Sequence, residues 1–213
     1  MRQDYKKATV SIRYWLLGKG YHNALKAMEF AARYHKGTRK DKVTPEFLHQ
    51  IEQSQLLRTL HSLLLFPEET FCALFLHDVP EDYDVSIEEI TLLFGKRVGD
   101  AVWRLTKKFR GMVKDEDQLF EEMARCPIAS VEKILDRINN VSSMDGVFSY
   151  EKQRDYLDFA ESRILPMAKR ARRHIPEQEA VYENLSYILK QQIALFRALH
   201  RDVGLVTTPE ATA

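Results

Sequence analysis

The chain has 213 residues, of which 32 are Lys or Arg and 31 are Asp or Glu, so its formal net charge is +1. This balance gives no reason to expect a general surface for nucleic acid or for membranes, although local basic clusters could still bind phosphate. Hydrophobic residues make up 45% and charged residues 30%, a composition that excludes wholesale disorder. The length fits one large domain or two small ones. No linker or repeat divides the chain, so we expect a single domain over residues 1–201.

The number of cysteines and the length of the apolar segments argue against a disulfide-rich, a membrane-spanning or a secreted protein. Cys72 and Cys126 are too few for a disulfide framework or a cysteine-rich zinc site, and we interpret both as small buried hydrophobic residues. The most apolar stretch, residues 60–66, is far shorter than the roughly 20 residues that a transmembrane helix needs. The polar residues 1–7 are not followed by the apolar core of a signal peptide. These features predict a cytoplasmic protein without a membrane partner.

Helical periodicity runs through nearly the whole chain. Only 8 Gly and 7 Pro interrupt it, and no alternating run rich in Val, Ile or Thr indicates a sheet, so we predict an all-α fold of about nine or ten helices. Pro45 and Pro67 open predicted helices, and Pro80 is expected to end one at Val79. The ranges 38–44 and 107–117 are predicted loops, and 202–213 a frayed tail. In chain order, the predicted helices cover residues 4–17, 22–36, 45–66, 67–79, 86–94, 96–108, 115–125, 128–144, 151–173 and 177–201.

The densest group of potential metal ligands follows the apolar run 71–76. Residues 77–82 read His-Asp-Val-Pro-Glu-Asp, with one imidazole and three carboxylates in six positions. Carboxylates at the C-terminus of a helix face its partial negative charge, which is unfavourable unless a cation is present. Imidazole and carboxylate ligands together suit Mn, Fe, Co or Zn better than Ca or Mg. The alternative interpretation is a solvated acidic turn.

Asp136 and Asn140 lie four residues apart on the predicted helix 128–144 and therefore share a face. That face lies opposite the apolar stripe of the same helix, so periodicity alone favours a solvated face over a binding site. The stripe consists of Val131, Ile134, Leu135 and Ile138.

Four segments, in order, resemble the HD-domain family of guanosine tetraphosphate hydrolases, which includes the hydrolase half of RelA/SpoT proteins and the stand-alone small alarmone hydrolases. They are residues 30–41 (FAARYHKGTRKD), 44–49 (TPEFLH), 73–82 (ALFLHDVPED) and 133–140 (KILDRINN). The similarity covers roughly residues 21–160 and leaves 161–201 as a C-terminal helical extension. It implies a helical HD domain with one metal ion, on which the helices that begin near Pro45, Pro67 and Ile128 converge.

The resemblance also assigns roles. Four residues match the family's ligands for a metal that is typically manganese: His49, His77, Asp78 and Asp136. The acidic pair that positions and deprotonates the attacking water corresponds to Glu81 and Asp82. Residues that match or resemble contacts to the nucleotide, or that could neutralise its pyrophosphate, are Arg39, Lys40, Lys107, Asn140, Lys152 and Tyr156.

The leading prediction is hydrolysis of guanosine tetraphosphate at its 3′ side, giving GDP and pyrophosphate. Two alternatives stay open: an HD-type nucleotidase or phosphatase acting on another nucleotide, and a non-catalytic nucleotide-binding or regulatory module. Intact ligands and an intact acidic pair favour an enzyme. Four positions depart from the family pattern on the substrate side and leave the exact nucleotide open: Glu46, Gln50, Tyr83 and Ser142.

Overall fold

The computed structural model describes residues 4–206, and α-helices account for most of them, which confirms the all-α prediction. None of these helices is long and apolar enough to cross a membrane. The helices are α1 (Tyr5–Lys19), α2 (His22–Tyr34), α3 (Leu48–Leu60), α4 (Pro67–Leu76), α5 (Val79–Tyr83), α6 (Ile87–Phe94), α7 (Lys96–Leu105), α8 (Glu116–Ala124), α9 (Pro127–Ser142), α10 (Tyr150–Phe159), α11 (Leu165–His174) and α12 (Glu179–Val206). Short 3₁₀ turns cover His61–Leu63 and Pro176–Gln178.

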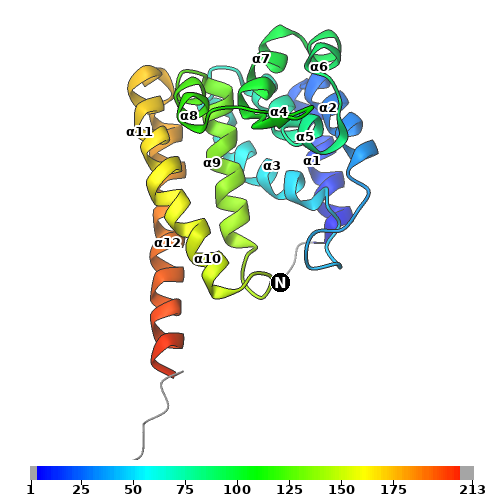
Figure 1. The fold of residues 1–213 in the computed structure, drawn as a ribbon. Coiled ribbons are helices and arrows are strands. Elements are labelled where there is room, and N and C mark those ends of the chain that lie inside the picture. Colours follow the sequence, from blue (N-terminus) through cyan, green and yellow to red (C-terminus); the bar gives the residue numbers. More distant parts are fainter. Residues whose placement is uncertain (1–3, 207–213) are drawn as a thin grey trace, which may run out of the picture.

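Helix α9 is the centre of the arrangement. It packs against α3 and α4 on one side and against α11 and α12 on the other, with α7 and α8 near its N-terminal end (Figure 1). Of its 16 residues, 11 are buried, and they include Asp136 and Asn139. The helix therefore has no broad solvated face. The interpretation of Asp136 as a surface residue, which periodicity alone favoured, is wrong because α9 is covered on both sides.

The break between α4 and α5 differs from the prediction. Helix α4 ends at Leu76, and His77 and Asp78 form a turn before α5 begins at Val79. Pro80 lies in the first turn of α5 rather than at the end of α4. Proline fits there because the first N–H groups of a helix have no intrahelical acceptor. As a result, the chain bends at His77 and Asp78.

Two predicted loops contain short β structure. Thr38 and Pro45 form an isolated antiparallel bridge, so α3 begins at Leu48 rather than at Pro45. Lys108–Phe109 (β1) pairs with Met112–Val113 (β2) as a hairpin. Its turn residues Arg110 and Gly111 have φ values of 48° and 83°. Positive φ at both central residues is the geometry of the type I′ turn that connects tight hairpins.

Three further differences concern the helices and the cysteines. The predicted helix 151–173 contains a π-helical segment, Ala160–Ile164, directly before Pro166, whose missing N–H and bulky ring disturb the preceding turn. The last helix continues to Val206 instead of ending at residue 201, since extending a formed helix needs no new nucleation. The remaining tail residues, 207–213, lie outside the described part. Cys72 is buried as predicted, whereas Cys126 is half-buried and caps α9.

Candidate metal centre and pocket

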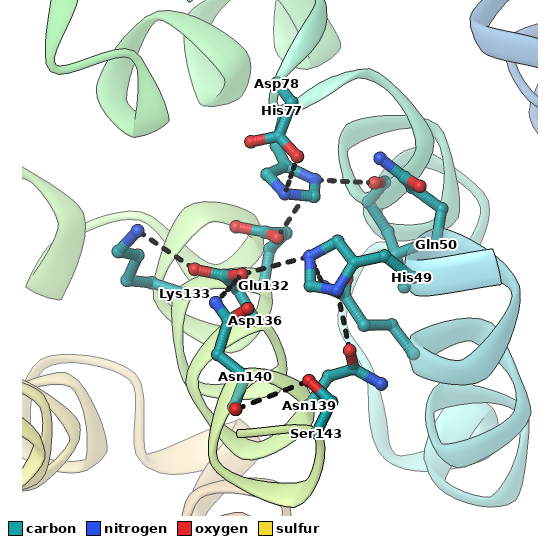
Figure 2. A network of polar contacts seen from close by, with 12 residues as sticks. His49, Gln50, His77, Asp78, Glu132, Lys133, Asp136, Asn139, Asn140 and Ser143 are labelled. Atoms are coloured by element: carbon teal, nitrogen blue, oxygen red, sulfur yellow. Dashed lines mark hydrogen bonds and ion pairs between the residues drawn. The ribbon is translucent and has the colours of Figure 1, made fainter. Parts of the chain in front are cut away.

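The four predicted ligands come together from three elements. His49 lies in the first turn of α3, His77 and Asp78 lie in the turn after α4, and Asp136 lies in the middle of α9 (Figure 2). The Nε2 atom of His49 is 3.1 Å from Oδ1 of Asp136. One ligand atom from each of His49, His77 and Asp78 lies within 4.8 Å of the others. The predicted convergence of three helices is therefore present.

Each imidazole is held so that its Nε2 atom faces a carboxylate. The Nδ1–H of His49 donates to Oδ1 of Asn139 over 2.6 Å, and its Nε2 atom lies 3.1 Å from Oδ1 of Asp136 and 2.7 Å from the side-chain amide nitrogen of Gln53. The Nδ1–H of His77 donates to the carbonyl oxygen of Leu74 over 2.8 Å. Its buried Nε2 lies 3.0 Å from Oδ2 of Asp78 without an aligned hydrogen bond to any described residue.

A lone pair that faces a carboxylate is repelled unless a proton or a cation lies between them. The Nε2 atom of His77 presents that arrangement toward Asp78, whereas the Nε2 atom of His49, which faces Asp136, is also contacted by the Gln53 amide at 2.7 Å. Two imidazole nitrogens and two carboxylate groups form a mixed donor set that suits a divalent transition metal. The residues present therefore fit the divalent metal that the resemblance implies.

Buried charges balance one another around these ligands. Burial alone would lower the pKa of His77, but the adjacent Asp78 and Glu132 carboxylates outweigh it and raise that pKa well above its usual range. Burial would raise the pKa of Asp136, but Lys133 and His49 hold it well below its usual range. The Lys133 ammonium lies 3.2 Å from Oδ2 of Asp136. In the metal-free protein, a proton on His77 compensates part of the negative charge of these carboxylates. A bound cation could compensate the same charge in its place.

A pocket of about 410 Å³ opens beside the ligands, and most of the predicted site residues line it. The metal ligands that reach its wall are His49, Asp78 and Asp136, and the other predicted residues in its lining are Arg39, Lys40, Asp82, Asn140 and Tyr156. The size suits a nucleotide-sized ligand.

Arg39 and Asn140 are engaged with α9. The Arg39 guanidinium donates to the side chains of Asn139, Asn140 and Ser143 over 3.1, 3.4 and 3.2 Å. The amide of Asn140 donates to Oδ1 of Asp136 over 2.6 Å. Arg39 therefore ties the loop before α3 to the C-terminal end of α9, and Asn140 fixes the Asp136 carboxylate. Both residues also line the pocket.

Basic and aromatic side chains form one wall of the pocket mouth. The ammonium groups of Lys40 and Lys152 lie over the ring of Phe148, at 5.1 and 4.4 Å from its centroid. Tyr156 packs on the same ring with a centroid distance of 5.2 Å, and the Arg137 guanidinium lies 4.8 Å from the centre of the Tyr156 ring. Lys152 and Tyr156, which match the family more loosely, thus both contact Phe148, and of the two only Tyr156 is in the pocket lining.

Glu81 and Lys107 are not brought into the pocket lining. The Glu81 carboxylate accepts hydrogen bonds from the backbone N–H groups of Lys107 and Lys108, the second over 3.0 Å. The Lys107 ammonium pairs with Glu116 at 2.5 Å. Asp82, in contrast, lines the pocket, where partial burial and then the charges of Asp78 and Glu81 raise its pKa to about 6.

The positions that depart from the family pattern mostly meet in one network. The Tyr83 hydroxyl donates to Oε2 of Glu46 over 2.9 Å and lies 3.2 Å from Nδ1 of His35. On the other side of that ring, the Gln50 amide is 3.4 Å from Nε2. Ser142 lies elsewhere, where it accepts a hydrogen bond from Gln192 of α12 over 2.6 Å.

Sequence reasoning missed four residues around the ligands. The first is Gln53, a buried residue whose amide nitrogen lies 2.7 Å from Nε2 of His49. Asn139 holds His49, Lys133 pairs with Asp136, and the fully buried Glu132 lies 3.2 Å from Nδ1 of His77. One signal was present in the sequence. Glu132 and Asp136 lie four residues apart on one helix face, and two like charges at that spacing are unfavourable unless something compensates them.

Comparison with known proteins agrees with this geometry. The family model described as the HD domain matches residues 27–147. A probable guanosine-3′,5′-bis(diphosphate) 3′-pyrophosphohydrolase of Synechocystis is 34% identical over 153 residues, which cover 68% of this chain and 20% of the relative. A protein with the same activity in its name from Aquifex aeolicus is 30% identical over 152 residues, 68% of this chain and 21% of the relative. A protein of Brucella melitensis named GTP pyrophosphokinase rsh is 29% identical over 136 residues, 60% of this chain and 18% of the relative.

The chain thus spans only about a fifth of the length of the curated relatives that it matches. The matched region contains every residue of the metal centre described above. Because the family model matches more than half of this chain, the chain belongs to the HD domain family.

Proposed function

We propose that this chain is a manganese-dependent phosphohydrolase that cleaves guanosine tetraphosphate at its 3′ side to give GDP and pyrophosphate. The main support is the cluster of His49, His77 and Asp78, which offer ligand atoms within 4.8 Å of one another, with Asp136 3.1 Å from His49, beside a pocket lined by basic and aromatic side chains. The curated relatives named 3′-pyrophosphohydrolases, which are similar over most of this chain, support the choice of substrate.

The proposed ligands are His49, His77, Asp78 and Asp136. Their mixture of nitrogen and carboxylate oxygen donors suits a divalent transition metal, and manganese is the one that the resemblance to the hydrolase family implies. When bound, such an ion polarises a phosphoryl oxygen and lowers the pKa of a coordinated water. The chain's own contribution is to fix the donors: Asn139 orients His49, the Leu74 carbonyl orients His77, and Lys133 with Asn140 holds Asp136.

Asp82 is the proposed acceptor of the proton from the attacking water. It lines the pocket, and its pKa of about 6 lies near the working range of a general base. Glu81 carries a different task in this proposal. By accepting from the backbone N–H groups of Lys107 and of Lys108, the first residue of β1, it anchors α5 and so fixes the position of Asp82.

The basic wall is proposed to hold the nucleotide. Lys40 and Lys152 supply two ammonium groups that can compensate the charge of a pyrophosphate. The half-buried aromatic side chains of Phe148 and Tyr156, which line the pocket, are the groups against which a base can pack. Arg39 adds a third positive charge between this wall and the metal ligands.

The test is a panel of purified nucleotides incubated with the protein and Mn²⁺, with the products separated by chromatography. We expect guanosine tetraphosphate to be consumed and GDP and pyrophosphate to appear in equal amounts. Asp136→Ala should lose this activity, whereas Asp117→Ala, which removes a carboxylate whose side chain is 77% exposed on α8, should keep it. Absence of turnover of guanosine tetraphosphate by the wild-type protein would contradict the proposal.

A second candidate is an HD-type nucleotidase or phosphatase that acts on another nucleotide. The network of Glu46, Tyr83 and Gln50 favours it, because it places an additional carboxylate in the pocket wall near Asp82. The same panel separates the two candidates. Orthophosphate released from a different nucleotide would select the second, and pyrophosphate released from guanosine tetraphosphate would select the first.

A further inference from the structure

A buried carboxylate with no partner lies directly behind the metal centre. Glu132 is on α9, one turn before Asp136, and none of its surface is exposed. Neither of its oxygens has a hydrogen-bond partner among the described residues. The closest charged group is the His77 imidazole, whose Nδ1 atom lies 3.2 Å from Oε1 of Glu132 (Figure 2).

The fold alone gives no reason to keep a carboxylate at this position. Its neighbours on α9 are Val131, Ile134 and Leu135, which belong to the hydrophobic core. An apolar side chain of similar volume would avoid the cost of burying a charged group. Glu132 also repels Asp136, which lies four residues further on the same helix. A bound cation at the neighbouring metal centre would compensate the negative charge of both Glu132 and Asp136.

The geometry indicates how Glu132 acts on that site. His77 faces Asp78 and the other ligands with its Nε2 atom, and it faces Glu132 and the Leu74 carbonyl with its Nδ1 atom. On the side of the ring away from the centre, Nδ1–H thus donates to the Leu74 carbonyl, and the Glu132 carboxylate lies 3.2 Å from the same nitrogen. A carboxylate behind a ligating histidine fixes the orientation of the ring and increases its basicity as a ligand.

We propose that Glu132 is a positioning residue that holds the His77 imidazole from behind and thereby raises the affinity of the site for its divalent metal. This inference rests on the proposed metal centre but is independent of the nucleotide that the protein hydrolyses. It concerns a residue that does not line the pocket. Its effect is therefore exerted through His77, not through the substrate.

The experiment measures the dissociation constant of Mn²⁺ from its free-ion signal in electron paramagnetic resonance, together with thermal unfolding of the metal-free protein. The variants are Glu132→Leu and the nearly isosteric Glu132→Gln, which keeps an acceptor oxygen without the charge. Ser130→Ala is the matched control. Ser130 is equally buried on α9, but its hydroxyl pairs with Tyr182 at 2.8 Å, away from the metal ligands.

We expect Glu132→Leu to weaken Mn²⁺ binding about 10- to 100-fold and Glu132→Gln to weaken it less. The metal-free Glu132→Leu protein should unfold at a temperature no lower than wild type, because an unpartnered buried carboxylate has been removed. Ser130→Ala should lower the unfolding temperature and leave Mn²⁺ affinity unchanged.

Mn²⁺ affinities within about threefold of wild type in both Glu132 variants would overturn the inference and leave the metal centre intact. An equal loss of affinity in Ser130→Ala would also overturn it, since general loosening of α9 would then explain the effect. If Glu132→Leu does not fold, Glu132→Gln alone decides by the same threefold limit. Failure of the wild-type protein to bind Mn²⁺ would instead reject the metal centre itself.

Discussion

The orientation of each histidine ligand is set by oxygen atoms on the far side of its ring. For His49 this acceptor is the side chain of Asn139, which also receives a hydrogen bond from Arg39 and donates one to Glu52 over 2.9 Å. Asn139 is therefore anchored on three sides and cannot rotate away. The rigidity of this one amide keeps the His49 lone pair directed at Asp136.

Replacing Asn139 tests that role. Asn139→Ala should weaken Mn²⁺ binding about 10-fold or more, because the His49 ring then loses the acceptor that fixes its tautomer. Asn139→Asp keeps an acceptor at the same place and should stay closer to wild type. Isothermal titration with Mn²⁺ gives both affinities, and an alanine variant that binds as tightly as the aspartate variant would contradict the assignment.

Asp82 and Glu81 are adjacent acids with different surroundings, so their neutral variants should differ. Asp82→Asn removes the carboxylate that lines the pocket and should lower kcat about 10²- to 10⁴-fold, or about 3–5 kcal/mol of barrier, with the metal retained. Glu81→Gln keeps an oxygen for the N–H groups of Lys107 and Lys108 and should cost less. Steady-state kinetics with metal analysis of each variant checks this order, and the reverse order would make Glu81 the acting base.

The pH dependence follows from the pKa of Asp82, which partial burial first, and then the charges of Asp78 and Glu81, raise to about 6. Because the carboxylate form is the base, kcat/KM should fall as pH drops through this value, and a bound cation would move the midpoint lower. The raised pKa also means that the ionised form is the less favourable one in the fold. This group's contribution to the stability of the metal-free protein therefore declines as pH rises from about 4 to 6. If kcat/KM of Asp82→Asn falls at low pH in the same way as that of the wild-type protein, Asp82 is not the group responsible.

At the scale of elements, α9 explains why part of the site escaped prediction. Its helical span and its Asp136 ligand could be predicted, the first from periodicity and the second from a resemblance. Its second buried face could not, because α11 and α12, which cover that side, follow it in the chain and pack there only in the folded protein. For the same reason the pairing of Asn139 with His49, 90 residues earlier, has no local signal.

The close approach of α6 and α7 depends on Gly99. A Cβ atom added there would overlap the side chain of Thr91, at 3.0 Å from its Cβ, and would lie 3.2 Å from its backbone Cα. Gly99→Ala should therefore destabilise the protein by about 1–3 kcal/mol. Gly18→Ala is the matched control, since the same atom meets nothing within 4 Å there, and it should stabilise α1 by about 0.5–1 kcal/mol. Chemical denaturation gives both changes, and two equal values would contradict the packing argument.

For the whole molecule, the metal centre joins elements that are distant in sequence. Its proposed ligands come from α3, from the turn after α4 and from α9, so a bound ion ties the N-terminal helices to the central one. His77 and Asp78 stood out in the sequence by the density of imidazole and carboxylate groups over residues 77–82, whereas His49 and Asp136 were predicted only from the resemblance. The placement of Lys40 and Lys152 over the same Phe148 ring could only be produced by the fold, since 112 positions separate those two residues.

Removal of the metal should therefore lower global stability. A ligand present at 100 times its dissociation constant stabilises the folded state by about 2.7 kcal/mol. In a protein of this size, that corresponds to a shift of about 5–10 °C in Tm. Thermal unfolding with Mn²⁺, with a chelator, and with Mn²⁺ added back should give a high, a low and a restored Tm. His77→Ala should give the low Tm under all three conditions, and a Tm that does not respond to Mn²⁺ in the wild-type protein would contradict the prediction.

The central claim is that one divalent ion is held between α3, the turn after α4 and α9. Anomalous diffraction from crystals grown with Mn²⁺ tests it most directly. The account predicts a single strong manganese peak at about 2 Å from donor atoms of four side chains, with Asp82 near the ion but not bound to it. These side chains are His49, His77, Asp78 and Asp136. A peak elsewhere, or none at this position, would contradict the claim.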